Sequence, residues 1–148
     1  MRSFVFKGCD LLAQTRTYTA LISEMKNRAS KAIQHVAQEM VEQLRFYLIE
    51  DFYNMYDPVM YQRTNQLKDS PTYEMLSENM AKVFIDMNNM EYRDASGSEV
   101  VNLAALGFHG NTNIFRPGFF WDDFIEWADN NVPTMLKNEL KKQGLNVK

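Results

Sequence analysis

The sequence is poor in the residues that build covalent or metal cross-links. It holds a single cysteine, Cys9, and two histidines, His35 and His109. One cysteine excludes an internal disulfide and any metal site made of cysteines alone. Neither histidine belongs to an HExxH, HxH or CxxC pattern. From the residues alone, we therefore expect no bound metal and no cofactor.

Long apolar runs are also missing. No stretch approaches the roughly 18 consecutive apolar residues of a membrane span. The apolar run near the first residues is too short for a signal peptide. These absences predict a soluble protein made in a cytoplasm. Glycine and proline are scarce as well, with six and four copies. Glycines 107, 110 and 118 do not have the spacing of a P-loop, which excludes that phosphate cradle.

What remains has the balance of a globular protein, with 45% hydrophobic and 24% charged residues among 148. We expect a single domain over residues 1–148. The net charge of −3 is uneven along the chain. Residues 1–68 carry nine Lys/Arg against seven Asp/Glu (+2), residues 69–131 three against eleven (−8), and residues 132–148 four against one (+3). No basic stripe favours DNA as a partner, whereas the acidic and basic regions can complement each other between copies.

Apolar residues at steps of three and four predict one long helix over about residues 19–54, on the order of 50 Å in length. Its apolar stripe consists of Ile22, Met25, Ala29, Ile33, Val36, Met40, Leu44 and Leu48. Its last turns are apolar on nearly all sides and should be the more buried end. Pro58 should stop the helix, because it pushes the preceding residue out of helical geometry. Residues 4–12 resemble a short strand or turn.

The rest of the chain predicts an α+β fold, with the long helix packed on a small antiparallel sheet. Apolar residues alternate with others over residues 81–87, the period of a strand. We assign the sheet to about residues 72–106. A C-terminal helical pair should occupy about residues 119–143, with a break near Pro133 and a close at Gly144.

Candidates for chemistry are few, and we assign no catalytic residue. His109 lies between glycines in "GFHGNTN", where close backbone approach is possible. It supports one alternative, a metal-dependent hydrolase or nuclease that uses His109 with Asp or Glu partners. Asp122, Asp123 and Glu126 lack the spacing of a calcium loop and are better explained as a solvated helix start.

The least ordinary stretch is "YDPVMYQRTNQLKDS", residues 56–70, directly after the long helix. With the residues before it, it fits the pattern aromatic-Tyr-x-x-Tyr-x-Pro-x-x-Tyr-x-Arg-Thr-x-x-Leu-x-x-Ser. A second piece, "NLAALGFHGN", carries a Gly-x-His-Gly signature. Together they resemble the small tail-component or neck proteins of the head–tail joining region of tailed phages. The resemblance covers about residues 21–110. It departs at Asn65, where the family has a glycine-like small residue.

The resemblance implies a structural virion protein rather than an enzyme. Such a protein would form or join a ring in the phage neck and contact head-closure, tail-terminator or tail-tube proteins, with no membrane and no specific nucleic acid. Its location would be the virion, after synthesis in the host cytoplasm. The interface residues implied are Tyr56, Tyr61, Arg63, Thr64 and His109.

Two other interpretations stay open at this point. The stretch could be an internal anchor, with Tyr56 and Tyr61 packed under the long helix and Arg63 paired with a carboxylate. Alternatively, the chain could be a small helical adaptor or chaperone, which would require the long helix to expose an apolar stripe in solution.

Overall fold

The structure is a computed structural model that describes residues 8–55, 57, 64–108 and 118–147, with side chains from Thr17 onward. The elements in chain order are α1 (Gly8–Tyr47), η1 (Leu48–Tyr53), α2 (Gln66–Asp69), β1 (Pro71–Ser77), β2 (Met80–Ile85), η2 (Met87–Asn89), α3 (Gly97–Ala105) and α4 (Phe120–Lys142). The predicted α+β class, with a long helix, a small antiparallel sheet and C-terminal helical structure, is confirmed.

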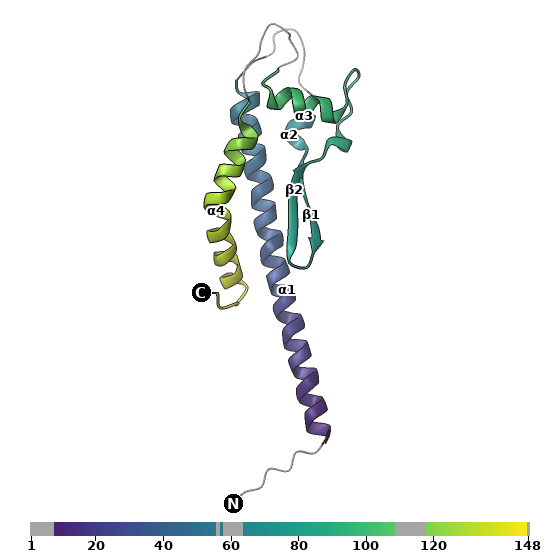
Figure 1. The fold of residues 1–148 in the computed structure, drawn as a ribbon, viewed down its shortest axis with the longest axis vertical. Coiled ribbons are helices and arrows are strands. Elements are labelled where there is room, and N and C mark those ends of the chain that lie inside the picture. Colours follow the sequence, from purple (N-terminus) through teal and green to yellow (C-terminus); the bar gives the residue numbers. More distant parts are fainter. Residues whose placement is uncertain (1–7, 56, 58–63, 109–117, 148) are drawn as a thin grey trace, which may run out of the picture.

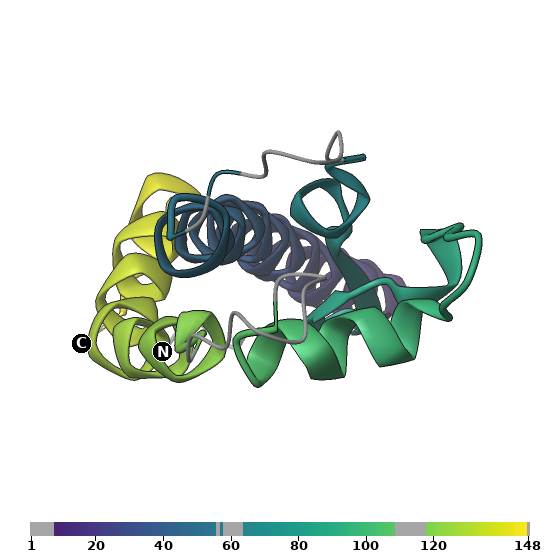
Figure 2. The same cartoon turned by 90° about the horizontal axis from the view of Figure 1, so that it is seen from above.

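The molecule is built along α1. Helix α4 runs antiparallel along one side of α1, and the β1–β2 hairpin lies along the other side (Figure 1). Seen from above, α1 forms the centre, with α4 and the hairpin on opposite flanks (Figure 2). The first half of α1 projects beyond both neighbours (Figure 1). The result is an elongated body with one helix extending from it.

The long helix starts earlier than predicted. It begins at Gly8 rather than near residue 19, so the strand or turn expected over residues 4–12 is wrong where the structure describes it. After Gly8 no glycine or proline interrupts the chain until Pro58, so nothing stops the helix from extending backward. At its other end, α1 continues as a π-helix, in which Asn54 N–H donates to the Ile49 carbonyl at 2.8 Å.

The sheet is smaller than predicted. Strands β1 and β2 pair antiparallel from Pro71↔Ile85 to Ser77↔Met80, and the described residues contain no further strand. The expected sheet over residues 72–106 is therefore wrong beyond Ile85. Residues 97–105 form helix α3, which begins with a capping box. Ser96 Oγ accepts from Glu99 N–H at 3.2 Å, and Glu99 Oε2 accepts from Ser96 N–H at 2.7 Å.

The predicted C-terminal pair is a single helix, α4, which passes through Pro133. A proline inside a helix leaves the carbonyl four residues earlier without its helical donor. Asparagine amides just before Pro133 donate to nearby carbonyls: Asn130 Nδ2 to Glu126 O at 2.9 Å and Asn131 Nδ2 to Trp127 O at 2.8 Å. These bonds reinforce the turn next to Pro133. As predicted, Gly144 closes the helix, with φ of 81°.

The core lies at the end of α1 that the sequence predicted to be the more buried. Its buried members are Leu44, Leu48, Leu67, Ile85, Met90, Ala104, Phe120 and Phe124. They come from α1, η1, α2, β2, α3, α4 and the residue after η2, so one cluster joins nearly every element. The predicted stripe is only partly buried, since Ile22 is 38% and Met25 49% exposed. No helix in the described part of the chain is long and apolar enough to cross a membrane.

Candidate functional site

The two sequence motifs lie in two connecting segments, and the first and last residues of both segments are at one end of the molecule. The first runs from Asn54, after η1, to Asn65, before α2; the second runs from Phe108, after α3, to Gly118, before α4. These four junctions lie where α1 ends and α4 begins (Figure 1). We call this end, bounded by η1, α2, the end of α3 and the first turn of α4, the loop end.

The first segment is closed by hydrogen bonds between its two ends. The Tyr53 hydroxyl accepts from the Lys68 backbone N–H at 3.1 Å. The Lys68 carbonyl in turn accepts from Arg45 Nε on α1 at 3.4 Å. Leu67, the residue directly before Lys68, is 1% exposed and belongs to the core. Helix α2 therefore holds the returning end of the segment firmly against α1.

A second clamp joins α2 to the chain after η2. Gln66 Nε2 donates to the Glu91 carbonyl at 2.9 Å, and Gln66 Oε1 accepts from Glu91 N–H at 2.7 Å. The side-chain amide of Gln66 thus satisfies both the N–H and the carbonyl of Glu91, as the backbone of a neighbouring strand would. It fixes the start of α2 independently of the contacts to α1.

Asn65 occupies the turn at which the resemblance expects a glycine-like residue. Its backbone is left-handed, with φ of 60° and ψ of 5°, and it is the one non-glycine residue with positive φ among those described. Glycine and asparagine adopt this conformation at the lowest cost. The departure from glycine thus keeps the turn geometry.

The second segment is closed by a close backbone approach. Phe108 N–H donates to the Leu103 carbonyl at 2.8 Å, after Gly107 turns the chain with φ of 80°. At the other side, a Cβ on Gly118 would lie 2.6 Å from the Ala104 carbonyl oxygen. The segment therefore starts at the end of α3 and comes back to it at Gly118. Only glycine fits at position 118, because any side chain would overlap the Ala104 carbonyl.

Of the predicted interface residues, the structure describes Thr64 alone. Thr64 is exposed at the loop end, directly before Asn65. Tyr56, Tyr61, Arg63 and His109 lie outside the described residues, so the choice between a displayed interface and a buried anchor is not tested there.

Two carboxyl groups meet at the base of the loop end. Asp51 of η1 has one buried oxygen, Oδ2, that receives no hydrogen bond from a protein donor. Burial, together with the charge and the hydrogen-bonding carboxyl of Asp123 on α4, raises the pKa of Asp51. Asp51 lies in the π-helix η1, a feature that often marks functional sites, and Asp123 lies in the first turn of α4.

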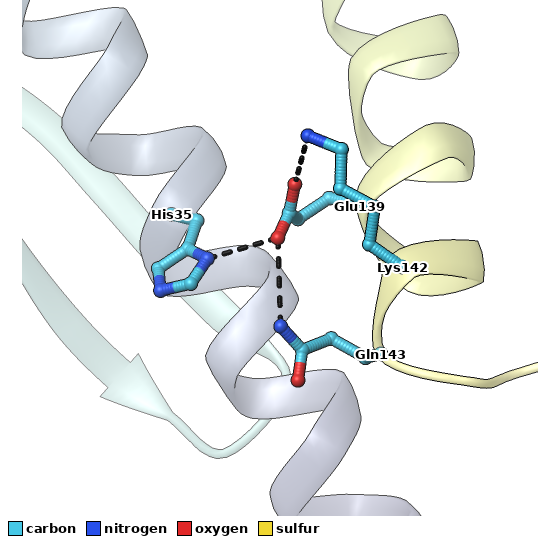
Figure 3. Close-up of polar contacts among 4 residues, drawn as sticks. All are labelled: His35, Glu139, Lys142 and Gln143. Carbon is cyan, nitrogen blue, oxygen red and sulfur yellow. Dashed lines mark hydrogen bonds and ion pairs between the residues drawn. The ribbon is translucent and has the colours of Figure 1, made fainter.

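The two histidines have separate surroundings. His35, on α1, contacts Glu139 of α4 with 2.9 Å between Nδ1 and Oε1 (Figure 3). Lys142 Nζ contacts the other carboxylate oxygen of Glu139 at 3.0 Å. These two partners, His35 first, lower the pKa of Glu139 to about 2. His35 thus contributes to the α1–α4 contact. Among the described residues, no three His, Cys, Asp or Glu side chains are grouped to hold a metal.

Sequence reasoning missed the residues that build the loop end. Gln66 and Asp51 carried no motif, because their partners lie at a distance in sequence. A usable signal existed for Asn65, since asparagine is enriched in left-handed turns, and for Ser96, since Ser-x-x-Glu is the capping-box pattern.

Comparison with known proteins places these elements in a family. The family model described as YomN matches residues 17–142. This chain belongs to the YomN family. The match includes α1 from Thr17, both clamped segments and α4. A relative is the SPbeta prophage-derived uncharacterized protein YomN of Bacillus subtilis (strain 168), which is 42% identical over 123 residues, or 78% of this chain and 83% of the relative. No solved structure matches. The family therefore includes a prophage-derived protein.

Proposed function

We propose that this chain is a structural protein of the phage neck, which joins head-closure and tail components as part of a ring. The observation that carries the proposal is the loop end, where both motif segments are closed and clamped on one core. The prophage origin of the relative supports the phage setting. The neck assignment itself comes from the resemblance of residues 52–70 and 102–111 to head–tail joining proteins.

The physical argument is preorganisation. A loop whose ends are fixed in advance loses less conformational entropy when a partner binds. The clamps at Tyr53, Gln66 and Gly118 fix the ends of both segments. Tyr61 and Arg63 lie in the sequence between the clamped residues Tyr53 and Gln66. Tyrosine and arginine are residue types that dominate interface energetics. The loop end is therefore suited to bind a neighbouring neck protein.

The proposed partners are head-closure, tail-terminator or tail-tube proteins, together with further copies of this chain. The work is binding geometry, so the proposal includes no catalytic residue, cofactor, membrane or specific nucleic acid. The proposed location is the virion. The elongated body supports this role, because it separates the loop end from the projecting half of α1 (Figure 1).

The test is the double substitution Tyr61→Ala with Arg63→Ala in a phage that encodes this chain. Each truncated hot-spot residue typically costs about 2 kcal/mol or more, roughly thirtyfold in affinity. The purified variant should stay folded with a near-normal melting temperature, while electron microscopy shows unjoined heads and tails. Glu78→Ala, in the exposed hairpin turn, is the matched control and should give joined particles.

Two outcomes contradict the proposal. Joined, infectious particles from the double variant would remove these residues from the interface. A variant that is insoluble or melts far lower would make the segment an internal anchor. Antibody labelling of intact virions gives an independent result, since labelling away from the neck would contradict the location.

A further inference from the structure

We propose that copies of this chain contact one another head to tail, through the projecting part of α1 and the outer face of the start of α4. The inference rests on the proposed ring and names the surfaces that would build it. We call the first surface the α1 stripe; it consists of Tyr18, Leu21, Ile22 and Met25. We call the second the α4 acidic face; it consists of Trp121, Asp122, Ile125, Glu126 and Asp129.

The α1 stripe is a continuous apolar row that stays exposed on the surface. Its members follow one another at steps of three, one and three, which places them on one side of the helix. They are 66%, 52%, 38% and 49% exposed, and every residue from 17 to 27 is exposed. Single exposed apolar residues are ordinary, whereas a contiguous apolar patch marks an interaction site.

The stripe also borders a groove. Leu21 and Met25 line it together with Gly144 and Leu145, which follow α4, and its volume is about 250 Å³. Arg28 fixes this arrangement by donating to the Gln143 carbonyl at 3.2 Å. The groove gives a partner side chain a place to enter beside the stripe.

The α4 acidic face combines apolar and acidic side chains at the opposite end of the body. Trp121 and Ile125, four residues apart, are 38% and 45% exposed. Asp122, Glu126 and Asp129 follow at steps of four and three and line a shallow groove of about 440 Å³ with Ile125. None of the ion pairs among the described side chains includes these three carboxylates.

Charge complementarity selects a second copy as the occupant. Lys26 and Arg28 flank the stripe, and residues 17–31 carry three basic side chains against one acid. Because α4 runs antiparallel to α1, its basic end with Lys137, Lys141 and Lys142 lies toward the same side of the molecule (Figure 1). The acidic start of α4 lies at the loop end. Stripe-to-stripe pairing would oppose regions of like net charge, whereas stripe-to-face pairing joins opposite charges.

A contact between two different surfaces is heterologous. Repeated from copy to copy, it closes into a ring when the rotation between neighbours allows closure. The contact would also cover both exposed apolar surfaces with one interaction.

The test uses two variants with changes at exposed positions. The stripe variant is Leu21→Gln with Met25→Gln, and the face variant is Ile125→Gln with Asp129→Asn. In sedimentation velocity, the unmodified chain should associate with rising concentration and less so in high salt. Each variant alone should bind at least about tenfold more weakly. Mixed together, the two should form a heterodimer that does not grow, because one intact stripe then meets one intact face.

Each alternative result overturns the contact. A face variant that self-associates normally would indicate stripe-to-stripe pairing. A mixture that does not associate would remove the stripe–face pairing. An unmodified chain that stays monomeric up to about 1 mM would do the same, because its dissociation constant would then exceed that concentration. Melting temperatures of both variants should match the unmodified chain, since all four positions are exposed.

A cross-link supplies a second measurement, which reports the pairing of the two surfaces directly. In a Cys9→Ser background, one copy carries Met25→Cys and another Ile125→Cys, and oxidation should give a mixed disulfide dimer. Met80→Cys on the hairpin replaces Ile125→Cys in the control, because Met80 is 54% exposed and outside both surfaces. Equal cross-linking of the control would contradict the proposed pairing.

Failure of this inference is distinguishable from failure of the neck function. A chain that labels the neck of virions but shows no stripe–face contact contradicts only the head-to-tail arrangement. A chain that forms the contact but is absent from virions contradicts the neck function and leaves the contact intact.

Discussion

The Tyr53 hydroxyl accepts a hydrogen bond from the Lys68 backbone N–H across a span of fifteen residues. This single bond joins the end of the long helix to the start of the hairpin region and closes the segment that carries the Tyr-x-Arg-Thr motif. The same two elements share the buried side chains of Leu48 and Leu67. The two ends of this segment are therefore anchored on the core.

Tyr53→Phe tests this closure directly. The change keeps the ring and leaves the half-buried N–H of Lys68 without its acceptor, which should lower the free energy of unfolding by about 1 kcal/mol. Urea unfolding followed by circular dichroism measures the difference. Tyr18→Phe, at a position that is 66% exposed, is the control and should change nothing. Equal stabilities for the two variants would show that the bond contributes little.

Asn65 offers a test of the backbone itself. Asn65→Gly should be neutral within about 0.5 kcal/mol, because glycine accepts φ of 60° without strain. Asn65→Val should lose about 1–2 kcal/mol, since a β-branched residue is disfavoured in the left-handed region. Thermal unfolding of the pair separates the two effects. A valine variant as stable as the glycine variant would contradict the left-handed turn.

Gly97 is required by a close approach between two elements. A Cβ at this position would overlap the Met87 carbonyl oxygen of η2. Gly97→Ala should therefore force η2 away from α3 and cost about 1–3 kcal/mol, although alanine favours a helix in isolation. Ser98→Ala, one residue later and exposed, is the control. A stabilised Gly97→Ala variant would mean that the two elements move apart freely.

The α1–α4 contact should depend on acid pH through Glu139. Its folded pKa is lowered to about 2, below the ordinary value of 4.5. Such a group contributes stability that is fully present above pH 4.5 and is lost as the pH falls toward 2. Glu139→Gln should remove this part of the pH dependence in melting curves recorded between those values. Glu78→Gln is the control, and an identical acid response of both variants would contradict the assignment.

Metal content tests the alternative built on His109. We expect elemental analysis of the purified chain to find no stoichiometric metal and chelators to leave its melting temperature unchanged. His109→Ala should behave in the same way, since we assign the residue no metal. A stoichiometric zinc or manganese that disappears in the His109→Ala variant would favour the hydrolase or nuclease interpretation.

The parts of the fold that sequence predicted correctly have local causes. The hairpin follows from alternation over residues 81–87, and the end of the long helix from the apolar turns before Pro58. The errors arose where two local signals competed. The sheet region was predicted to extend to about residue 106, but the Ser96–Glu99 capping box starts helix α3 before that point. Pro133 predicted a break, but helix α4 continues along α1 through it.

The candidate site was predictable only in its position. The motif located the loop after the long helix, because the residues that form it are contiguous. Its clamps were not predictable, since Gln66 and Glu91 are 25 residues apart and meet only after the hairpin folds. The Asp51–Asp123 pair was not predictable for the same reason, because the two residues meet only once α4 packs on η1.

The projecting half of α1 implies a gradient of hydrogen exchange along one continuous helix. Its amides near Leu44 and Leu48 lie over the shared core, so their exchange should require unfolding of the whole domain. Amides between residues 17 and 27 have no such cover, and an isolated helix of this length is marginal in water. Exchange there should be fast in the free chain and slow once a neighbouring surface covers it. The helix would thus complete its own folding during assembly.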